Sequence, residues 1–212
     1  MSEIILECGS GNTCQNDPAI VRQMIDAVDA IDTQKHDVVF KWQIFIEAPP
    51  NVRLTHNTFR YAFDYAAAKG YKTTASVFDK LSLNYLLMYD PCFVKIACRP
   101  ELYWLVGEVP RKIPVYVSYN DDQIYNLPWG TGSGAWLCCV PKYPALLKEY
   151  EESEILDYYD MQAGTSDHTV GLELWNTYHP AIWEKHYVLE HDDNNPDAGP
   201  FAVTPEDLKE IL

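Results

Sequence analysis

The chain has 212 residues, of which 16 are basic and 31 acidic, for a net charge of −15. The length predicts a single domain over residues 1–212 with a sizeable core. The charge argues against nucleic acid and anionic membranes as partners, because both bind clustered Lys and Arg. No apolar run approaches the ~20 residues that span a membrane and no signal peptide is visible, so we expect a cytoplasmic protein. The six cysteines show no CxxC spacing, which favours buried thiols.

Strand-like and helix-like segments alternate through the first half of the chain. A short apolar strand at residues 4–7 leads into Gly9-Ser-Gly11, which we interpret as a flexible loop. Pro18 then begins a helix whose apolar residues recur every three or four positions up to Ile31. The segments that follow are predicted as a strand at 37–45, a helix at 58–69, a strand at 72–77 and a helix at 81–88.

The second half of the chain repeats this alternation with less helix. We predict strands at 93–97, 114–118, 135–140, 164–168 and 181–188. The helices predicted between and after them lie at 102–109, 145–160 and 172–178, with a last one beginning at Thr204. Residues 120–134 read as a polar loop where a helix would be expected.

Eight strands separated by mostly helical segments predict a parallel sheet of the α/β class. We expect a compact (β/α)8 TIM barrel with some helices reduced, since such barrels usually need about 250 residues. An open doubly wound sheet is the alternative, although no GxGxxG motif follows the first strand.

Polar residues recur at or near the ends of these strands, where a parallel barrel carries its active site. His168 and His186 end consecutive strands, and two neutral imidazoles that converge suit a divalent transition metal. Lys41 and Lys95 could form a cationic pocket for phosphate and carboxylate groups. The alternative is that these two histidines and two lysines have only structural roles, as hydrogen-bonded core residues or members of ion pairs. The other four histidines are expected at the surface. The recurrent strand-end positions are Glu7, Lys41, Gln43, Ser76, Lys95, Ser118, Ser166, Asp167, His168, Glu184, Lys185 and His186.

The order of these motifs resembles the N-acetylneuraminate (sialic acid) synthase family. Its strand ending in a glutamate is similar to Ile5-Leu-Glu-Cys-Gly9, and its K-F-Q-T-F and K-I-A-S strands are similar to segments around Lys41 and Lys95. Its S-T-P-F-D and L-H-C-x-x-x-Y-P segments resemble residues 75–79 and 137–144. The most specific pair is Gly164-Thr-Ser-Asp-His-Thr-Val-Gly171 followed by Glu184-Lys-His186, which resembles G-x-S-D-H-T-x-G and E-K-H.

The resemblance implies a transferase of sialic-acid-type carbohydrate biosynthesis that condenses phosphoenolpyruvate with an amino-sugar aldehyde. By this resemblance Glu7 would be the acid/base residue, and Tyr143 and Asp197 would contact the acceptor sugar. Lys41, Ser76, Lys95, Ser118 and Ser166 would hold phosphoenolpyruvate. His168 and His186 would bind the metal, usually Mn²⁺, with Mg²⁺ or Co²⁺ as further candidates. A homodimer is compatible with this reading.

The sequence also departs from the family pattern. Cys98 stands where the family has the serine of K-I-A-S, Arg99-Pro100 replaces Gly-Glu, and Pro141 replaces an asparagine. The second β–α segment is short, and the sequence given ends where the family continues into an antifreeze-like domain. These departures support an alternative, a divergent barrel that binds a phosphorylated or sugar ligand without turnover. A metal hydrolase on the same barrel is disfavoured because the first strand carries no His-x-His.

Overall fold

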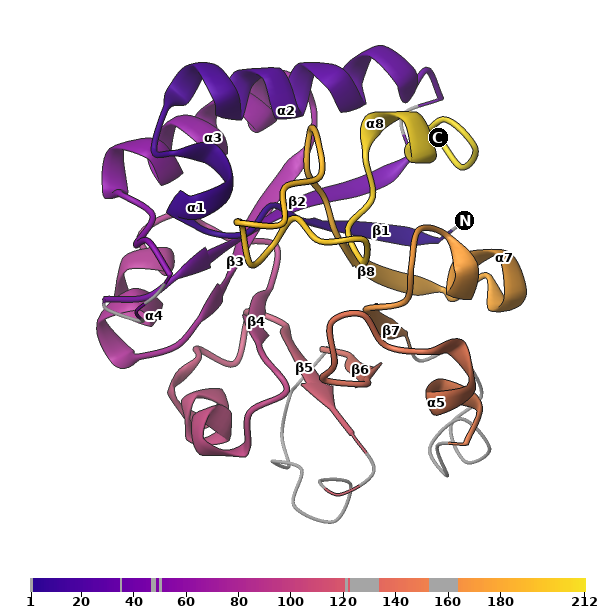
Figure 1. Cartoon of the computed structure of the whole chain (residues 1–212). Helices are drawn as coiled ribbons and strands as arrows, with labels where there is room; N and C mark the ends of the chain where they lie inside the picture. Colours follow the sequence, from indigo (N-terminus) through magenta and orange to yellow (C-terminus); the bar gives the residue numbers. More distant parts are fainter. Residues whose placement is uncertain are drawn as a thin grey trace.

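Eight parallel strands close into a barrel in the order in which they occur in the sequence. The computed structural model describes residues 2–34, 36–46, 49, 51–120, 122, 134–152 and 164–212. The last strand pairs with the first, Glu7 lying beside His186, so the sheet has no open edge. The (β/α)8 barrel is therefore confirmed, and the open doubly wound alternative is wrong. Figure 1 shows the strands in the middle of the molecule with the helices around them.

The strands lie close to the positions expected from the sequence. They are β1 (Glu3–Glu7), β2 (Asp37–Ile44), β3 (Lys72–Val77), β4 (Val94–Ile96), β5 (Val115–Tyr119), β6 (Trp136–Cys139), β7 (Thr165–Asp167) and β8 (Ile182–His186). The helices are α1 (Gly11–Cys14), α2 (Pro18–Ile31), α3 (His56–Ala68), α4 (Lys80–Leu86), the 3₁₀ helix η1 (Pro100–Glu108), α5 (Leu147–Glu151), α7 (Glu173–Tyr178) and α8 (Pro205–Leu208).

Several helices differ from the sequence prediction. Gly9-Ser-Gly11 is not a flexible loop, because Ser10 caps the one-turn helix α1. The helix expected at 102–109 is a 3₁₀ helix that begins at Pro100. Within the helix expected at 145–160, α5 covers Leu147–Glu151, and residues 153–160 lie outside the described part. Most of the loop predicted at 120–134 also lies outside it.

Strand alternation divides each strand between two environments, because successive side chains point to opposite faces. On β2, Phe40 and Trp42 pack outward against the helices in the main hydrophobic core, and Lys41 lies on the opposite face. Inside the barrel, Ile5, Val39 and Phe93 form a separate apolar cluster. Glu7 and Lys41 follow Ile5 and Val39 by two residues, so the next inward layer is polar and lies toward the carboxyl ends.

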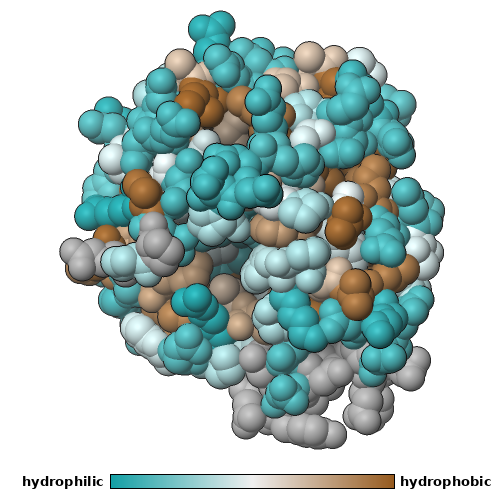
Figure 2. All heavy atoms as spheres, in the orientation of Figure 1, coloured by the Kyte–Doolittle hydropathy of each residue, from teal (hydrophilic) through white to brown (hydrophobic). Residues whose placement is uncertain are grey.

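The six cysteines all lie in the described part of the chain and form no disulfide. Four of them are buried as expected, but Cys92 and Cys98 are half-buried. Among the described residues, no helix is long and apolar enough to cross a membrane. Figure 2 shows that hydrophilic side chains cover most of one face, in keeping with the acidic composition.

A buried carboxylate joins the end of α2 to Tyr71, the residue directly before β3. Asp32 is fully buried and accepts hydrogen bonds from the backbone N–H of His36, from its Nδ1 (2.8 Å) and from Tyr71 Oη (3.1 Å). His36, expected at the surface, is therefore half-buried in this contact. Burial by itself would raise the pKa of Asp32, but these hydrogen bonds outweigh it and lower the pKa.

We expect the Asp32→Asn variant to lose about 1–3 kcal/mol of unfolding free energy at neutral pH, because charge-assisted hydrogen bonds to a buried acceptor are lost. Since the folded-state pKa of Asp32 is depressed, this stabilisation is present above the unfolded pKa of about 3.9 and is lost as pH falls through the folded value. Urea denaturation should therefore show the two proteins converging below about pH 4. Asp64→Asn, at an exposed position of α3, is the control and should change stability by less than about 0.5 kcal/mol.

Candidate functional site

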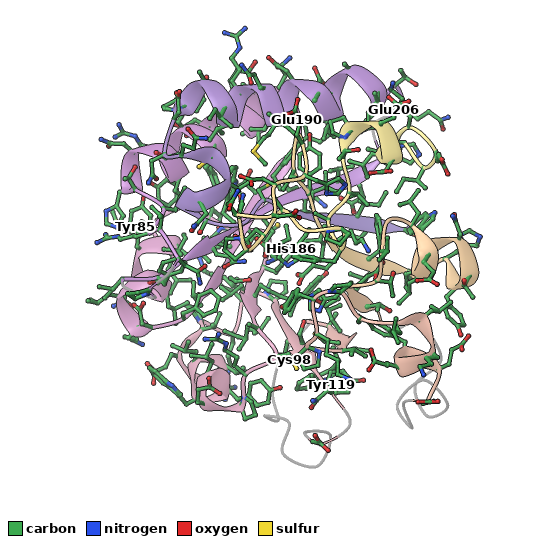
Figure 3. The ribbon with its side chains drawn as sticks, in the orientation of Figure 1. Tyr85, Cys98, Tyr119, His186, Glu190 and Glu206 are labelled. Atoms are coloured by element: carbon green, nitrogen blue, oxygen red, sulfur yellow. The ribbon has the colours of Figure 1, made fainter. Side chains whose placement is uncertain are left out.

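A cavity of about 420 Å³ lies at the carboxyl ends of the strands. Residues from all eight strands and from the loops that follow several of them contribute to its wall. Figure 3 shows His186, one of these residues, near the centre of the barrel, whereas Tyr85 and Glu206 lie at its periphery. All ten residues singled out from the sequence line this cavity, namely Glu7, Lys41, Ser76, Lys95, Ser118, Tyr143, Ser166, His168, His186 and Asp197.

Two buried lysines and two glutamates form the inner wall of the cavity. Lys41 forms an ion pair with Glu7 on the neighbouring strand and donates a hydrogen bond to Ser76 Oγ (2.8 Å). Lys95 donates to Ser118 Oγ (2.7 Å) and to the carbonyl of Ile96. Each lysine is therefore held by a serine hydroxyl from the next strand, with its ammonium group inside the barrel.

Glu184 connects the two lysines, and sequence reasoning assigned it no role. Its carboxylate lies 3.8 Å from Lys41 Nζ and 3.5 Å from Lys95 Nζ, and it accepts a hydrogen bond from Ser166 Oγ (3.0 Å). Burial raises its pKa, but the two ammonium groups outweigh burial and lower it. For Lys41, burial wins over the attraction of Glu184 and lowers the pKa to about 8. The signal in the sequence was alternation, which puts Glu184 on the same face of β8 as His186.

The two predicted histidines lie next to each other, with ring centroids 5.7 Å apart. His168 Nδ1 donates to the carbonyl of Val140 (2.7 Å), which leaves Nε2 as the ring's lone-pair nitrogen. His186 Nδ1 is buried and has no hydrogen-bond partner among the described residues, although Asp197 Oδ1 lies 3.5 Å away. Burial lowers the pKa of His168 to about 4 and holds the pKa of His186 well below its ordinary value, so both rings are neutral at pH 7.

Asp197 and Tyr143 border the histidine pair. Asp197 lies in the segment between β8 and α8, which crosses in front of the strands in Figure 1, and accepts a hydrogen bond from Gln43 Nε2 (3.2 Å). Burial raises its pKa. Tyr143 stays 56% exposed, with its ring 4.2 Å from that of His168. Gly9 allows this arrangement, because a Cβ there would lie 2.6 Å from Asp197 Oδ2 at a φ of +69°.

A second, fully buried ion pair lies on the outer side of β7 and β8, directly before the two histidines in sequence. Lys185 Nζ lies 3.0 Å from Asp167 Oδ2, and both side chains are completely buried. Asp167 also accepts hydrogen bonds from Trp183 Nε1 (2.9 Å) and from the backbone N–H and hydroxyl of Thr169, whose carbonyl accepts one from Lys185. This network ties β7 to β8 and thereby orients His168 and His186.

The arrangement suits a small anionic ligand. The cavity wall carries two ammonium groups with their counter-ions, three serine hydroxyls and a pair of neutral imidazoles. Among the described residues, no group of three or more His, Cys, Asp or Glu side chains is arranged to hold a metal ion. Asn51, Phe78 and Arg99 also line the cavity and were not predicted as site residues, because they follow strands rather than end them.

We expect Asp167→Asn to cost about 3–5 kcal/mol of unfolding free energy, because Lys185 would then be a buried charge without its carboxylate. The double variant Asp167→Asn/Lys185→Met should lose less than the sum of the two single changes, as denaturant titration can show. Lys72→Met removes the exposed pair with Asp37 (2.8 Å) and should cost less than about 1 kcal/mol. Equal losses for Asp167→Asn and Lys72→Met would contradict a structural role for the buried pair.

Solved structures resemble the fold of this chain, although the comparisons by sequence found no match. No protein-family model matches the sequence, and no curated protein matches it. N-acetylneuraminic acid synthetase from Leptospira borgpetersenii serovar Hardjo-bovis superposes with a TM-score of 0.76 at 20% identity, over 99% of this chain and 80% of that chain. Spore coat polysaccharide biosynthesis protein SpsE from Bacillus subtilis gives 0.76 at 21% identity, over 99% and 65%.

A truncated 3-deoxy-D-arabino-heptulosonate 7-phosphate synthase from Thermotoga maritima is similar at a lower level. Its TM-score is 0.65 at 12% identity, over 99% of this chain and 83% of that chain. At these identities the likeness concerns the fold, and it covers the whole barrel in each case. The resemblance expected from the sequence motifs is thus confirmed in three dimensions: the chain has the barrel fold of the N-acetylneuraminate synthases.

Proposed function

We propose that the chain is a metal-dependent synthase that condenses phosphoenolpyruvate with an amino-sugar-type aldehyde. The observation that carries the proposal is the buried group of Lys41, Lys95 and Glu7 beside the neutral pair His168 and His186 in one cavity. Buried ammonium groups are costly unless a carboxylate or a ligand compensates them, so their recurrence in a cavity favours an anionic substrate. The fold likeness to two proteins of sugar-acid and polysaccharide synthesis supports the same reading.

Phosphoenolpyruvate carries a phosphate and a carboxylate, and the cavity offers donors for both. Lys41 and Lys95 would provide the positive charge, and Ser76, Ser118 and Ser166 the hydroxyl donors. Ser76 and Ser118 already accept from the two ammonium groups, which leaves each hydroxyl proton for the ligand. Tyr143 and Asp197, which border the histidine pair, would contact the acceptor aldehyde.

The histidine pair fits a divalent ion such as Mn²⁺. The Nε2 lone pair of His168 is available, and His186 Nδ1 is buried without a hydrogen-bond partner among the described residues. The two neighbouring rings would therefore offer two neutral nitrogen ligands. The donation of His168 Nδ1 to the Val140 carbonyl fixes the tautomer, as outer-shell partners of metal ligands commonly do. When bound, the ion would act as a Lewis acid on the aldehyde oxygen.

Beside the metal, the residues of the chain would bind phosphoenolpyruvate and move the protons of the reaction. The enol carbon C3 of phosphoenolpyruvate forms a bond to the aldehyde carbon, whose oxygen takes up a proton from water, and C2 becomes cationic. Water adds to C2 and Glu7 accepts its proton. The C2–O bond to the phosphate then breaks while the C2 hydroxyl gives its proton to the departing phosphate, which releases hydrogen phosphate and leaves a 2-oxo acid. Lys41 and Lys95 balance the negative charge of phosphoenolpyruvate throughout.

A barrel that binds such a ligand without turnover is the second candidate. Cys98 and Pro141 line the cavity at positions where the synthase motifs have a serine and an asparagine. Each replacement removes a strong hydrogen-bonding group from the wall, since a thiol is a weak donor and proline has no polar side chain. Binding could survive these losses through the two lysines while catalysis is weakened.

With Mn²⁺, phosphoenolpyruvate and a panel of amino-sugar aldehydes, we expect release of inorganic phosphate that depends on the aldehyde. Glu7→Gln should lower kcat by about 100-fold or more, in the range that general acid/base residues contribute. A phosphate-release assay measures both. No release with any aldehyde, combined with calorimetric binding of phosphoenolpyruvate, would favour the second candidate, and absence of binding as well would contradict both.

For the metal, we expect His168→Ala and His186→Ala each to weaken Mn²⁺ binding by about 100-fold or more, since changes to outer-shell partners alone cost about 10–100-fold. Calorimetry on the purified protein without substrate measures this independently of activity. His179→Asn is the matched control, because His179 is exposed at the end of α7 and its φ of +48° tolerates asparagine. Unchanged Mn²⁺ affinity in either cavity variant would overturn the site.

A further inference from the structure

Arg99 is the third cation of the cavity wall, and neither the sequence motifs nor the proposed reaction uses it. It follows the end of β4 by three residues and directly precedes η1, whereas Lys95 lies within the strand. Its side chain is exposed while Lys41 and Lys95 are buried, although all three line the cavity. The lysines therefore lie at the inner end of the cavity, and Arg99 lies at its mouth.

The charges of the cavity distinguish Arg99 from the two lysines. Lys41 is paired with Glu7 and approaches Glu184, and Lys95 approaches Glu184 from the other side. No carboxylate among the described residues forms an ion pair with Arg99. The chain has a net charge of −15, yet this arginine at the mouth of the cavity forms no ion pair with any acidic side chain that the structure describes. The guanidinium group can bind a phosphate or carboxylate through two parallel hydrogen bonds.

Two neighbours support this position for an anion. The Arg99 guanidinium lies over the ring of Phe78, 5.7 Å from its centroid, and Phe78 lines the cavity too. This cation–π contact holds the charged group at the rim without neutralising it. Arg99 is also the N-cap residue of the nine-residue helix η1, so the positive end of that helix dipole lies next to it in the chain.

From this geometry we infer that Arg99 determines acceptor specificity: it binds a terminal phosphate or carboxylate on the aldehyde substrate. The inference rests on the proposed function, in which Lys41 and Lys95 hold phosphoenolpyruvate at the inner end. The phosphate or carboxylate of the acceptor would then bind to Arg99 at the mouth of the cavity. The acceptor class is accordingly an anionic aldose, a sugar phosphate or a sugar acid, rather than a neutral amino sugar.

The test compares N-acetylmannosamine, its 6-phosphate and the corresponding 6-carboxylate as acceptors for the wild type, Arg99→Met and Arg99→Lys. We expect the wild type to prefer an anionic form by about 10–100-fold in kcat/KM, as charge-assisted hydrogen bonds to one arginine allow. Arg99→Met should remove this preference and Arg99→Lys should retain part of it. Arg111→Met, at an exposed arginine outside the cavity wall, should leave all values unchanged.

Binding measurements separate this inference from the proposed function. Calorimetry should show phosphoenolpyruvate binding Arg99→Met as tightly as the wild type, and the 6-phosphate binding it about tenfold or more weakly. If Arg99→Met instead weakens phosphoenolpyruvate and leaves the acceptor preference intact, Arg99 belongs to the phosphoenolpyruvate site and the inference is overturned. Equal use of neutral and anionic aldoses by the wild type would also overturn it. If no aldose releases phosphate, the proposed function fails, and calorimetry with the 6-phosphate still decides the role of Arg99.

Discussion

The cost of placing charged groups inside a closed barrel governs the organisation of this molecule. Lys41, Lys95 and Glu184 lie in its interior, where an isolated charge would be strongly unfavourable. They are tolerated because each ammonium group has a carboxylate within 4 Å and a serine hydroxyl from the adjacent strand. Closure of the sheet makes this possible, since it brings β8 next to β1 and Glu184 between the two lysines.

The layering inside the barrel explains why the charged groups gather at one end. Ile5, Val39 and Phe93 fill the interior near the amino ends of the strands, where no ligand could enter. Two residues further along β1 and β2, the inward positions become Glu7 and Lys41. The outward positions of the same strands stay apolar and join the helices in the main core. Each strand thus contributes both to stability and to the cavity, because its two faces alternate.

The same division applies to the two histidines. His168 and His186 face the cavity, while the residues immediately before them, Asp167 and Lys185, form a fully buried pair on the other side of the strands. A buried pair of this kind contributes little net stability compared with apolar packing, yet removing one partner is costly. Its value here lies in orientation, because it joins β7 to β8 with the imidazoles side by side.

Particular residues show which parts of the fold and of the cavity could be predicted from the sequence. Strand positions and the polar strand ends followed from local patterns, because period-2 alternation is written in the sequence itself. The full set of ten cavity residues, including Tyr143 and Asp197, was implied by the resemblance to the synthase motifs. Glu184 was expected among the polar strand ends but was given no role, because its contacts with both lysines depend on which strands become neighbours when the sheet closes. Phe78 and Arg99 were not predicted, because they follow strands rather than end them. The cap on α1, the half-buried His36 and the 3₁₀ form of η1 likewise depend on distant contacts. The sequence by itself thus determined an eight-strand α/β chain with a polar rim, and the tertiary structure alone decided which charges pair, since pairing requires strands far apart in sequence to meet.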